Sequence, residues 1–142
     1  MTKIRFVKQP TLNTCVSACL AMILNKPVEK VIEEFHSRYY NNWEITISEY
    51  LTKNGVKHHC SEGGGREALH MGGLFLCTVP SLNIPGALHQ IVIDMTDHKF
   101  IVHDPIKGWE GKKFYVGPDQ DPEEPGAFII HTWVKDVEIL PY

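Results

Sequence analysis

The stretch KQPTLNTCVSACLAMIL, residues 8–24, joins a turn to a continuous apolar run. Over 15–24 nearly every side chain is apolar or small, and a helix that is apolar on all sides is normally a buried one. Asn13 or Thr14 can serve as its N-cap, and Pro27 should end it, because the residue before a proline avoids the helical region. We therefore predict a buried helix near the start of the fold.

The remainder of the chain predicts an α+β protein. Amphipathic helices are expected over 28–36 and 46–55, with Gly55 at the C-terminus of the second. Short runs with strand character cover 3–7, 56–60, 74–80, 88–94, 99–104, 112–116, 127–132 and 133–140. We expect a helical half up to about residue 55 and an antiparallel meander from about 56 to 142, with the buried helix packed on the curved sheet.

Length and composition restrict the class of protein. The 142 residues suit one domain, 1–142, and 43% hydrophobic with 22% charged residues is typical of a globular chain. A net charge of −3 supplies no basic field for nucleic acid. No apolar run approaches the roughly 20 residues that span a bilayer, and MTKIRFVKQP lacks the apolar region of a signal peptide. We expect a cytoplasmic protein that binds neither nucleic acid nor membrane.

Two of the four cysteines, Cys15 and Cys19, stand one helical turn apart. Their Cα atoms would be about 6 Å apart, a poor arrangement for a disulfide, and thiols are expected in a reducing compartment. A thiol becomes nucleophilic when its thiolate is stabilised, and the unpaired N–H groups of a first helical turn do this. Cys15 lies in that turn, whereas Cys19 lies further in and is expected to be inert packing. A purely structural Cys15 is the alternative.

A cysteine nucleophile needs a base, and the hairpin LHQIVIDMTDHKFIVHD offers one. A turn centred on Thr96 and Asp97 would pair Ile93 with Phe100, Ile91 with Val102, and His89 with Asp104. Side chains directly opposite each other are about 4.5–5.5 Å apart at Cβ, so Asp104 could orient His89 and stabilise its protonated form. His103 would point to the other face. The alternative is a cross-strand pair without a chemical role.

Gln9 is the candidate for the oxyanion donor. Its amide could reach back over the turn PTLNT and join the Cys15 backbone N–H at a tetrahedral oxyanion. A solvated glutamine at a strand end is the alternative.

These residues together resemble a papain-like cysteine peptidase, and within that fold the bacteriocin-processing, double-glycine peptidases of family C39 and their standalone relatives. The matching features are Gln9 six positions before Cys15, the helix CVSACLAMIL, and the strands ALHQIVID and FIVHDPIKG. The resemblance implies a papain-like fold with Cys15 as nucleophile, His89 as general base and then acid, Asp104 as orienting residue and Gln9 as oxyanion donor.

The chain departs from the family pattern on both sides of the nucleophile. The family usually has Asp before the cysteine and Gly after it, where this chain has Thr14 and Val16. The Val16 side chain would narrow the cleft beside Cys15, which argues against the double-glycine substrate more than against catalysis.

We expect, from the resemblance and the residues together, a cysteine peptidase or amide hydrolase that acts on a peptide or protein and needs no cofactor or metal. One alternative is a peptide- or partner-binding module with a vestigial triad, and another is a transpeptidase-like acyl transferase. The segment His58–Cys60, with His70 and Cys77, has metal-ligand residue types but lacks a Cys-x-x-Cys or His-x-x-x-His pair, so no zinc site is predicted. Gly63–Gly65 is read as a surface loop that a double-glycine peptidase could cut.

Overall fold

The computed structural model describes residues 4–62 and 68–141 of the chain. Its helices are α1 (Cys15–Leu24), α2 (Val28–Val31), the π-helical turn η1 (Ile32–His36), α3 (Ser37–Tyr40) and α4 (Ile47–Lys53). Its strands are β1 (His58–Cys60), β2 (Leu74–Pro80), β3 (Leu88–Asp94), β4 (Ile101–His103), β5 (Phe114–Val116), β6 (Ala127–Ile129) and β7 (Val134–Ile139). In the described ranges every helix precedes every strand, and the fold is α+β as predicted. None of these helices is long and apolar enough to cross a membrane.

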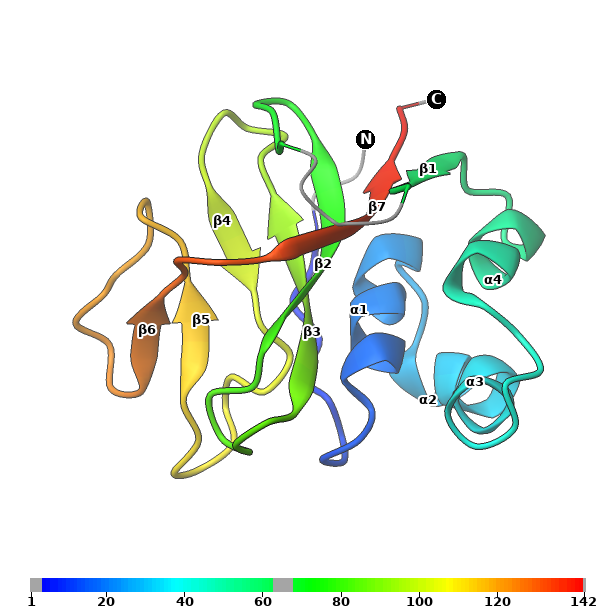
Figure 1. The fold of residues 1–142 in the computed structure, drawn as a ribbon, viewed down its shortest axis with the longest axis horizontal. Helices are drawn as coiled ribbons and strands as arrows, with labels where there is room; N and C mark the ends of the chain where they lie inside the picture. The colour runs from blue at the N-terminus through cyan, green and yellow to red at the C-terminus, as the bar shows by residue number, and fades with distance from the viewer. Residues whose placement is uncertain (1–3, 63–67, 142) are drawn as a thin grey trace.

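The sheet is not the simple meander that we expected. Five antiparallel strands lie in the order β1-β7-β2-β3-β4, so the last strand lies between the first and the second (Figure 1). Strands β5 and β6 form a separate pair, and they run parallel. Parallel neighbours cannot be joined by a tight hairpin, and the loop 117–126 provides the crossing between them. The chain then returns from β6 to the large sheet as β7, between β1 and β2.

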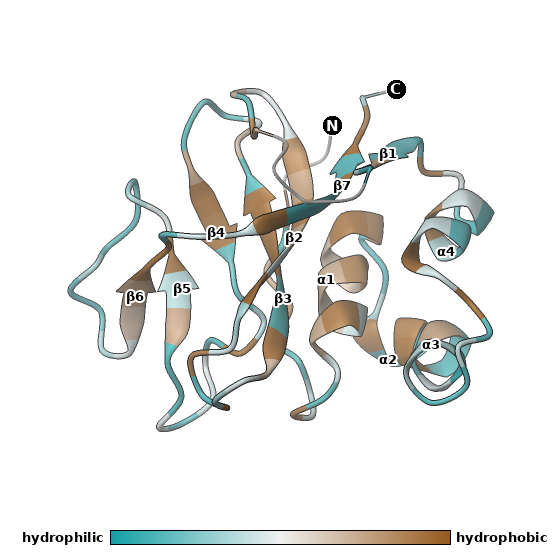
Figure 2. Cartoon of the chain, in the orientation of Figure 1, coloured by the Kyte–Doolittle hydropathy of each residue, from teal (hydrophilic) through white to brown (hydrophobic). Residues whose placement is uncertain are grey.

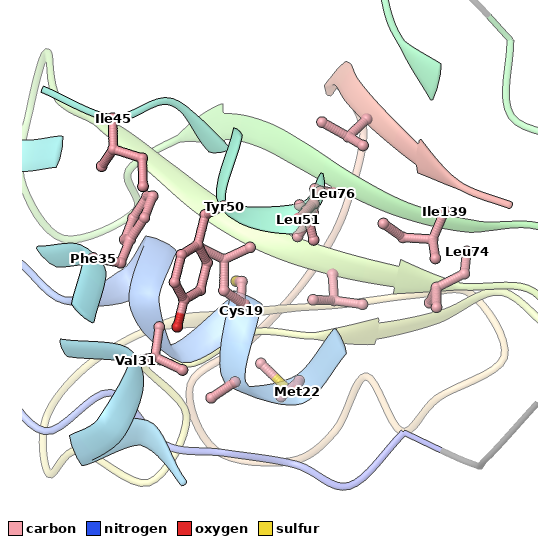
Figure 3. Packing of buried hydrophobic residues seen from close by; sticks show 14 residues of the cluster. Cys19, Met22, Val31, Phe35, Ile45, Tyr50, Leu51, Leu74, Leu76 and Ile139 are labelled. Carbon is pink, nitrogen blue, oxygen red and sulfur yellow. The ribbon is translucent and has the colours of Figure 1, made fainter. Parts of the chain in front are cut away.

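Helix α1 lies between the five-stranded sheet and the other helices, as Figure 1 shows. Its residues from Ser17 to Met22 are buried, and the helix is apolar on most sides (Figure 2). Residues from every surrounding layer pack on it, among them Val31, Phe35, Tyr50, Leu51, Leu74, Leu76 and Val92 (Figure 3). The prediction of a buried helix over 15–24 is confirmed, and α1 is the centre of the larger core cluster.

The ends of α1 differ in how well the sequence predicts them. Asn25 takes a left-handed conformation (φ 51°) and its N–H donates to the Ala21 carbonyl, so the helix ends just before Pro27 as expected. Thr14 does occupy the N-cap position, but its side chain makes no cap bond. Its hydroxyl instead accepts a hydrogen bond from the backbone N–H of Thr11 at 3.0 Å. The threonine therefore stabilises the turn before the helix, and the first helical N–H groups stay available.

The second helical region is longer than the predicted 28–36, because α2, η1 and α3 follow one another without a break up to Tyr40. Aromatic side chains four residues apart explain the extension. The ring of Tyr39 stacks on Phe35 with centroids 4.8 Å apart, and Tyr40 stacks on His36 at 5.4 Å. Helix α4 begins with a capping box between Thr46 and Glu49. It is followed by Gly55 at a positive φ of 76°, as predicted.

Residues 4–7 form no strand, contrary to the strand predicted over 3–7. Just after this segment, Gln9 forms backbone hydrogen bonds with the second half of the chain. The Gln9 N–H donates to the Pro105 carbonyl at 2.8 Å, and the Trp109 indole N–H donates to the Gln9 carbonyl at 2.8 Å. The N-terminal segment is therefore joined to the loop after β4.

A second core cluster covers the opposite face of the sheet. It includes Phe75, Cys77, Ile91, Ile93, Val102 and Tyr115, with Ile130 from directly after β6. Ile91 and Ile93 pack here while Val92 packs against α1, as the alternation of side chains along a strand requires. The sheet is thus buried on both faces.

Gly117, which follows β5 directly, should not tolerate a side chain. A Cβ at this position would lie 2.1 Å from the carbonyl oxygen of Phe100, a backbone atom directly before β4 that cannot move away as a flexible side chain would. We expect Gly117→Ala to lower the free energy of unfolding by about 1–3 kcal/mol, measured by chemical denaturation. Gly111→Ala is the control, since nothing lies within 4 Å of its Cβ position and only its positive φ opposes the change. Equal losses in both variants would contradict the close contact.

Candidate active site

Cys15 is the first residue of α1 and is partly buried. The first helical hydrogen bond from this end is donated by Ala18 to the Thr14 carbonyl at 3.0 Å, so the N–H groups before Ala18 have no carbonyl within the helix. Burial raises the pKa of the Cys15 thiol, but His89 and the backbone N–H groups of Gln90 and Val16 lower it by more. The net pKa lies below that of an ordinary cysteine. Cys15 is therefore a stabilised thiolate site.

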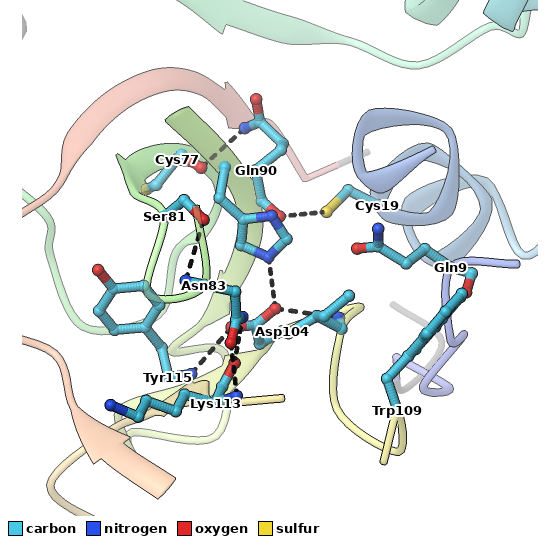
Figure 4. Close-up of polar contacts among 12 residues, drawn as sticks. Gln9, Cys19, Cys77, Ser81, Asn83, Gln90, Asp104, Trp109, Lys113 and Tyr115 are labelled. Carbon is cyan, nitrogen blue, oxygen red and sulfur yellow. Dashed lines mark hydrogen bonds and ion pairs between the residues drawn. The ribbon is translucent and has the colours of Figure 1, made fainter. Parts of the chain in front are cut away.

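His89 is held by a buried carboxylate. The distance from its Nε2 to Asp104 Oδ1 is 2.6 Å, and Asp104 is only 2% exposed. The same carboxylate accepts hydrogen bonds from two backbone N–H groups, those of Ile106 at 3.1 Å and Tyr115 at 2.8 Å. Figure 4 shows Asp104 between β5 and the loop that carries Trp109. Because Nε2 is bonded to Asp104, Nδ1 is the ring nitrogen left for Cys15.

The pKa of His89 rises to about 9. Burial on its own would lower this pKa, but the hydrogen bonds to Asp104 and Cys15 and the charges of both groups outweigh burial. The pKa of Cys15 is lowered at the same time, and these opposite shifts favour a thiolate–imidazolium pair over the neutral pair. Such a pair has both the nucleophile and the proton that a leaving amine requires.

His89 and Asp104 meet as predicted, but the predicted pairing of their strands is wrong. Ile93 lies opposite Val102 rather than Phe100. The turn is centred on Thr96 and Asp97, since the His98 N–H donates to the Met95 carbonyl at 3.1 Å. His98 then takes a positive φ of 57°, which lengthens the loop before β4 begins at Ile101.

The displacement of the pairing amounts to two residues, so every side chain keeps its face of the sheet. Asp104 therefore stays on the same face as Ile91, and it becomes a diagonal rather than a direct neighbour of His89. Diagonal neighbours are within reach of a histidine. His103 lies opposite Val92, on the other face, as predicted.

Gln9 is buried, at 1% exposed, rather than solvated. Its Nε2 donates to the Thr11 carbonyl at 2.8 Å, which uses one of its two amide hydrogens. Its Oε1 is buried without a hydrogen-bond partner in the described residues. In Figure 4 the carboxamide extends from the Trp109 side toward Asp104. The second amide hydrogen remains for another acceptor.

Both cysteines of α1 face the same residue of β3. The Gln90 N–H lowers the pKa of Cys15 by hydrogen bonding, and the Cys19 thiol donates to the Gln90 carbonyl at 3.4 Å. Burial raises the pKa of Cys19 well above its ordinary value, so Cys19 is a neutral donor. All four cysteines are free, and Cys77 is buried. Helix position separates the two thiols of α1 as expected, but Cys19 has a polar contact in addition to its packing.

A cleft of about 690 Å³ opens at Cys15 and His89. Leu88, His89 and Gln90 all line this cleft, although successive side chains of a strand point to opposite faces. All three can do so because β4 ends at His103 and leaves this edge of β3 uncovered. Val16 lies in its wall, next to Cys15. Large exposed apolar side chains surround the opening: Leu12, Tyr40, Trp43, Ile84 and Leu88.

Trp43 is the clearest residue that sequence reasoning missed. Tryptophan side chains are largely buried on average, yet that of Trp43 is 86% exposed, and the residue has a positive φ of 54°. The signal in the sequence was its place in NNWE, a polar loop with no apolar neighbour to pack against. Trp133, in contrast, does pack, with its ring 5.6 Å from that of Phe100. Trp109 bonds to Gln9, on the N-terminal segment, rather than to His89 or Asp104.

The described residues contain no group of three or more His, Cys, Asp or Glu arranged to hold a metal ion. His58 is hydrogen-bonded to Ser48 at 2.7 Å and to the Val56 carbonyl at 2.9 Å. His70 lies 3.2 Å from a Glu138 carboxylate oxygen. The Gly63–Gly65 segment is outside the described residues.

When the chain is compared with protein-family models, with curated proteins and with solved structures, nothing matches it. The case for a function therefore depends on the geometry of the site and on the motifs in the sequence.

Replacing Asp104 should lower the pKa of His89. We expect Asp104→Asn to move the His89 pKa, measured by NMR titration, from about 9 back toward 6.5. A raised pKa in the folded state adds stability that is complete below about pH 6.5 and disappears as the pH rises through about 9. The stability difference between wild type and variant should therefore shrink above pH 9. Asp97→Asn, in the exposed hairpin turn, is the matched control and should leave the titration unchanged.

Proposed function

We propose that the protein is a cysteine peptidase or related amide hydrolase. The observation that carries this proposal is the Cys15 thiol at a helix start, with a lowered pKa, beside a histidine that a buried carboxylate holds at 2.6 Å. A purely structural His89–Asp104 pair would not explain the lowered pKa of Cys15. A structural thiol in an apolar site has a raised pKa, as Cys19 and Cys77 do. Perturbed pKa values of opposite direction in one cleft are typical of catalytic pairs.

The reaction follows from the roles of these groups. The Cys15 thiolate forms a bond to the carbonyl carbon of the substrate, and the imidazolium of His89 donates its proton to the leaving amine as the C–N bond breaks. A water molecule then gives a proton to His89 as its oxygen attacks the thioester carbon, and the C–S bond breaks to release the carboxylic acid and restore the Cys15 thiolate beside the protonated His89. Asp104 keeps the imidazole oriented and stabilises its charge throughout.

Two donors are assigned to the oxyanion of the tetrahedral intermediate. The Cys15 backbone N–H is one, as an unpaired group of the first helical turn. The second amide hydrogen of Gln9 is the other, since the first is already held by Thr11. A donor that is already in position requires no reorganisation during the reaction. Removing one such donor from an enzyme has raised the activation free energy by about 3–4 kcal/mol.

The arrangement supports a papain-like fold of the kind found in the C39 peptidases. An apolar helix that begins with Cys15 packs across an antiparallel sheet. His89 follows on β3 and Asp104 directly after the neighbouring strand β4, in the order that the resemblance implies. We therefore assign the chain to the papain-like class as part of the proposal.

The cleft favours a substrate with large apolar side chains. Among the described residues that line it none is Asp, Glu, Lys or Arg, and its rim includes Trp43 and Leu88, which are 86% and 75% exposed. Burying such side chains against a ligand is worth about 1.5–3 kcal/mol each. A cleft that selects glycine does so by letting the substrate backbone approach its wall closely. The Val16 side chain in the wall of this cleft opposes such an approach.

Incubation with a diverse peptide library, followed by mass spectrometry, tests the activity. Wild-type protein should cut peptides, Cys15→Ala should not, and His89→Ala should be slower by about 10²–10⁴-fold because the proton transfers are lost. Cys60→Ala is the matched control, since Cys60 is an exposed thiol outside the cleft and its loss should change nothing. Cleavage that persists in Cys15→Ala would refute the proposed mechanism. If only acyl transfer to an added amine were found, the chain would be a transferase.

The preference of the cleft has its own test. Among the peptides cut, those with Leu, Ile, Phe or Trp near the scissile bond should dominate, and Trp43→Ala should lower kcat/KM for them by about tenfold, the equivalent of about 1.4 kcal/mol of apolar contact. Met71→Ala is the control, because Met71 is 54% exposed and lies outside the cleft. An unchanged kcat/KM in Trp43→Ala would mean that the rim does not contact the substrate.

A further inference from the structure

Gln90 makes more polar contacts around the site than a strand residue next to a catalytic base requires. It is buried, at 6% exposed, and its backbone faces α1 through both of its polar groups. The N–H is directed to the Cys15 sulfur and the carbonyl accepts from the Cys19 thiol at 3.4 Å. The N–H and C=O of one strand residue point to the same side, so both contacts lie on the edge of β3 where β4 has already ended.

The Gln90 side chain is bonded in the opposite direction, into the sheet. Its Nε2 donates to the Cys77 carbonyl at 2.9 Å and to Asp136 Oδ2 at 3.2 Å (Figure 4 draws the first of these). Asp136 Oδ2 also accepts from the Thr78 hydroxyl at 2.6 Å. Strand β2, the neighbour of β3, and strand β7, on the far side of β2, therefore both hold the glutamine.

Asp136 reaches this position because β7 has an irregularity there. Leu76 pairs with Val137 while the next residue, Cys77, pairs with Lys135, so Asp136 is an extra residue without a partner in the ladder. A bulge of this kind redirects one side chain, and bulges are over-represented next to active sites. The bulge supplies a carboxylate acceptor under the floor of the cleft, where Thr78 and Gln90 are both lining residues.

We propose that Gln90 is a positioning residue of the Cys15–His89 site, held by its side-chain bonds to Asp136 and Cys77 so that its backbone N–H stays against the Cys15 sulfur. This inference rests on the proposed function and adds to it the reason why the thiolate is stabilised from the strand as well as from the helix. Since His89 directly precedes Gln90, the same anchor also sets the position of the base. Cys19 contributes the second contact to the Gln90 backbone.

The experiment measures alkylation of Cys15 by iodoacetamide as a function of pH, with the exposed Cys60 as an internal reference. Other titratable groups face Cys15 or its partners and must be considered in the profile: His36, Tyr39, Cys19, His89, Asp104 and Asp136. We expect Gln90→Ala to raise the apparent pKa of Cys15 by about one unit, which is about a tenfold lower alkylation rate at pH 6. Cys60 should react as in the wild type.

Variants of Asp136 keep the test decisive if Gln90→Ala is unstable. Asp136→Ala removes the acceptor and should also raise the Cys15 pKa, whereas Asp136→Asn retains an acceptor oxygen and should restore the wild-type profile. The matched control is Gln120→Ala. Gln120 makes three hydrogen bonds, two with the backbone of Val102 and one with the N–H of Gly117. Val102 lies in β4, which does not face Cys15.

The possible outcomes separate this inference from the proposed function. A wild-type Cys15 that titrates like Cys60 would overturn the ion pair and the proposed function with it. A low wild-type pKa that is unchanged in folded Gln90→Ala and Asp136→Ala proteins would overturn only the positioning role. An equal shift in Gln120→Ala would also overturn it, because general loosening of the sheet would then explain the result.

Discussion

The packing of α1 against the uncovered edge of β3 is the contact on which the site depends. Because α1 is apolar on nearly all sides, it is stable only where other layers enclose it, and the sheet and the remaining helices do so. That burial brings the first turn of the helix against Leu88–Gln90, where β4 has ended and the outer edge of β3 has no neighbouring strand among the described residues. The Cys15 thiol from the helix and the His89 imidazole from the strand thus meet in one cleft.

The charges of the site are stabilised by groups that come from separate parts of the chain. The Cys15 thiolate is stabilised by His89, by the helix start and by the Gln90 N–H. The imidazolium is stabilised by Asp104, whose carboxylate is itself held by two backbone N–H groups. Burying a charge costs free energy because its hydrogen bonds to water are lost. Here each buried charge has hydrogen bonds within the protein that replace those to water. This explains how two pKa values can shift in opposite directions within one buried pair.

Much of the fold could be predicted because it depends on local periodicity. The helix 15–24 and the strands 74–80 and 88–94 match the observed α1, β2 and β3 at both ends. The face of each side chain in the hairpin was also correct, even though the pairing was displaced by two residues, because strand faces depend only on whether a shift is odd or even. The insertion of β7 between β1 and β2 has no such local signal.

The sequence by itself determined that Cys15 begins a buried helix and that His89 and Asp104 share a strand face, since capping, apolar run length and alternation are properties of neighbouring residues. Only the tertiary structure decided which edge of β3 faces α1, that Trp43 stands exposed at the cleft, and that Asp136 bonds to Gln90 across 46 residues of chain. These features arise where β4 stops and where β7 carries an extra residue. Both depend on how distant strands pack together, which no local pattern encodes.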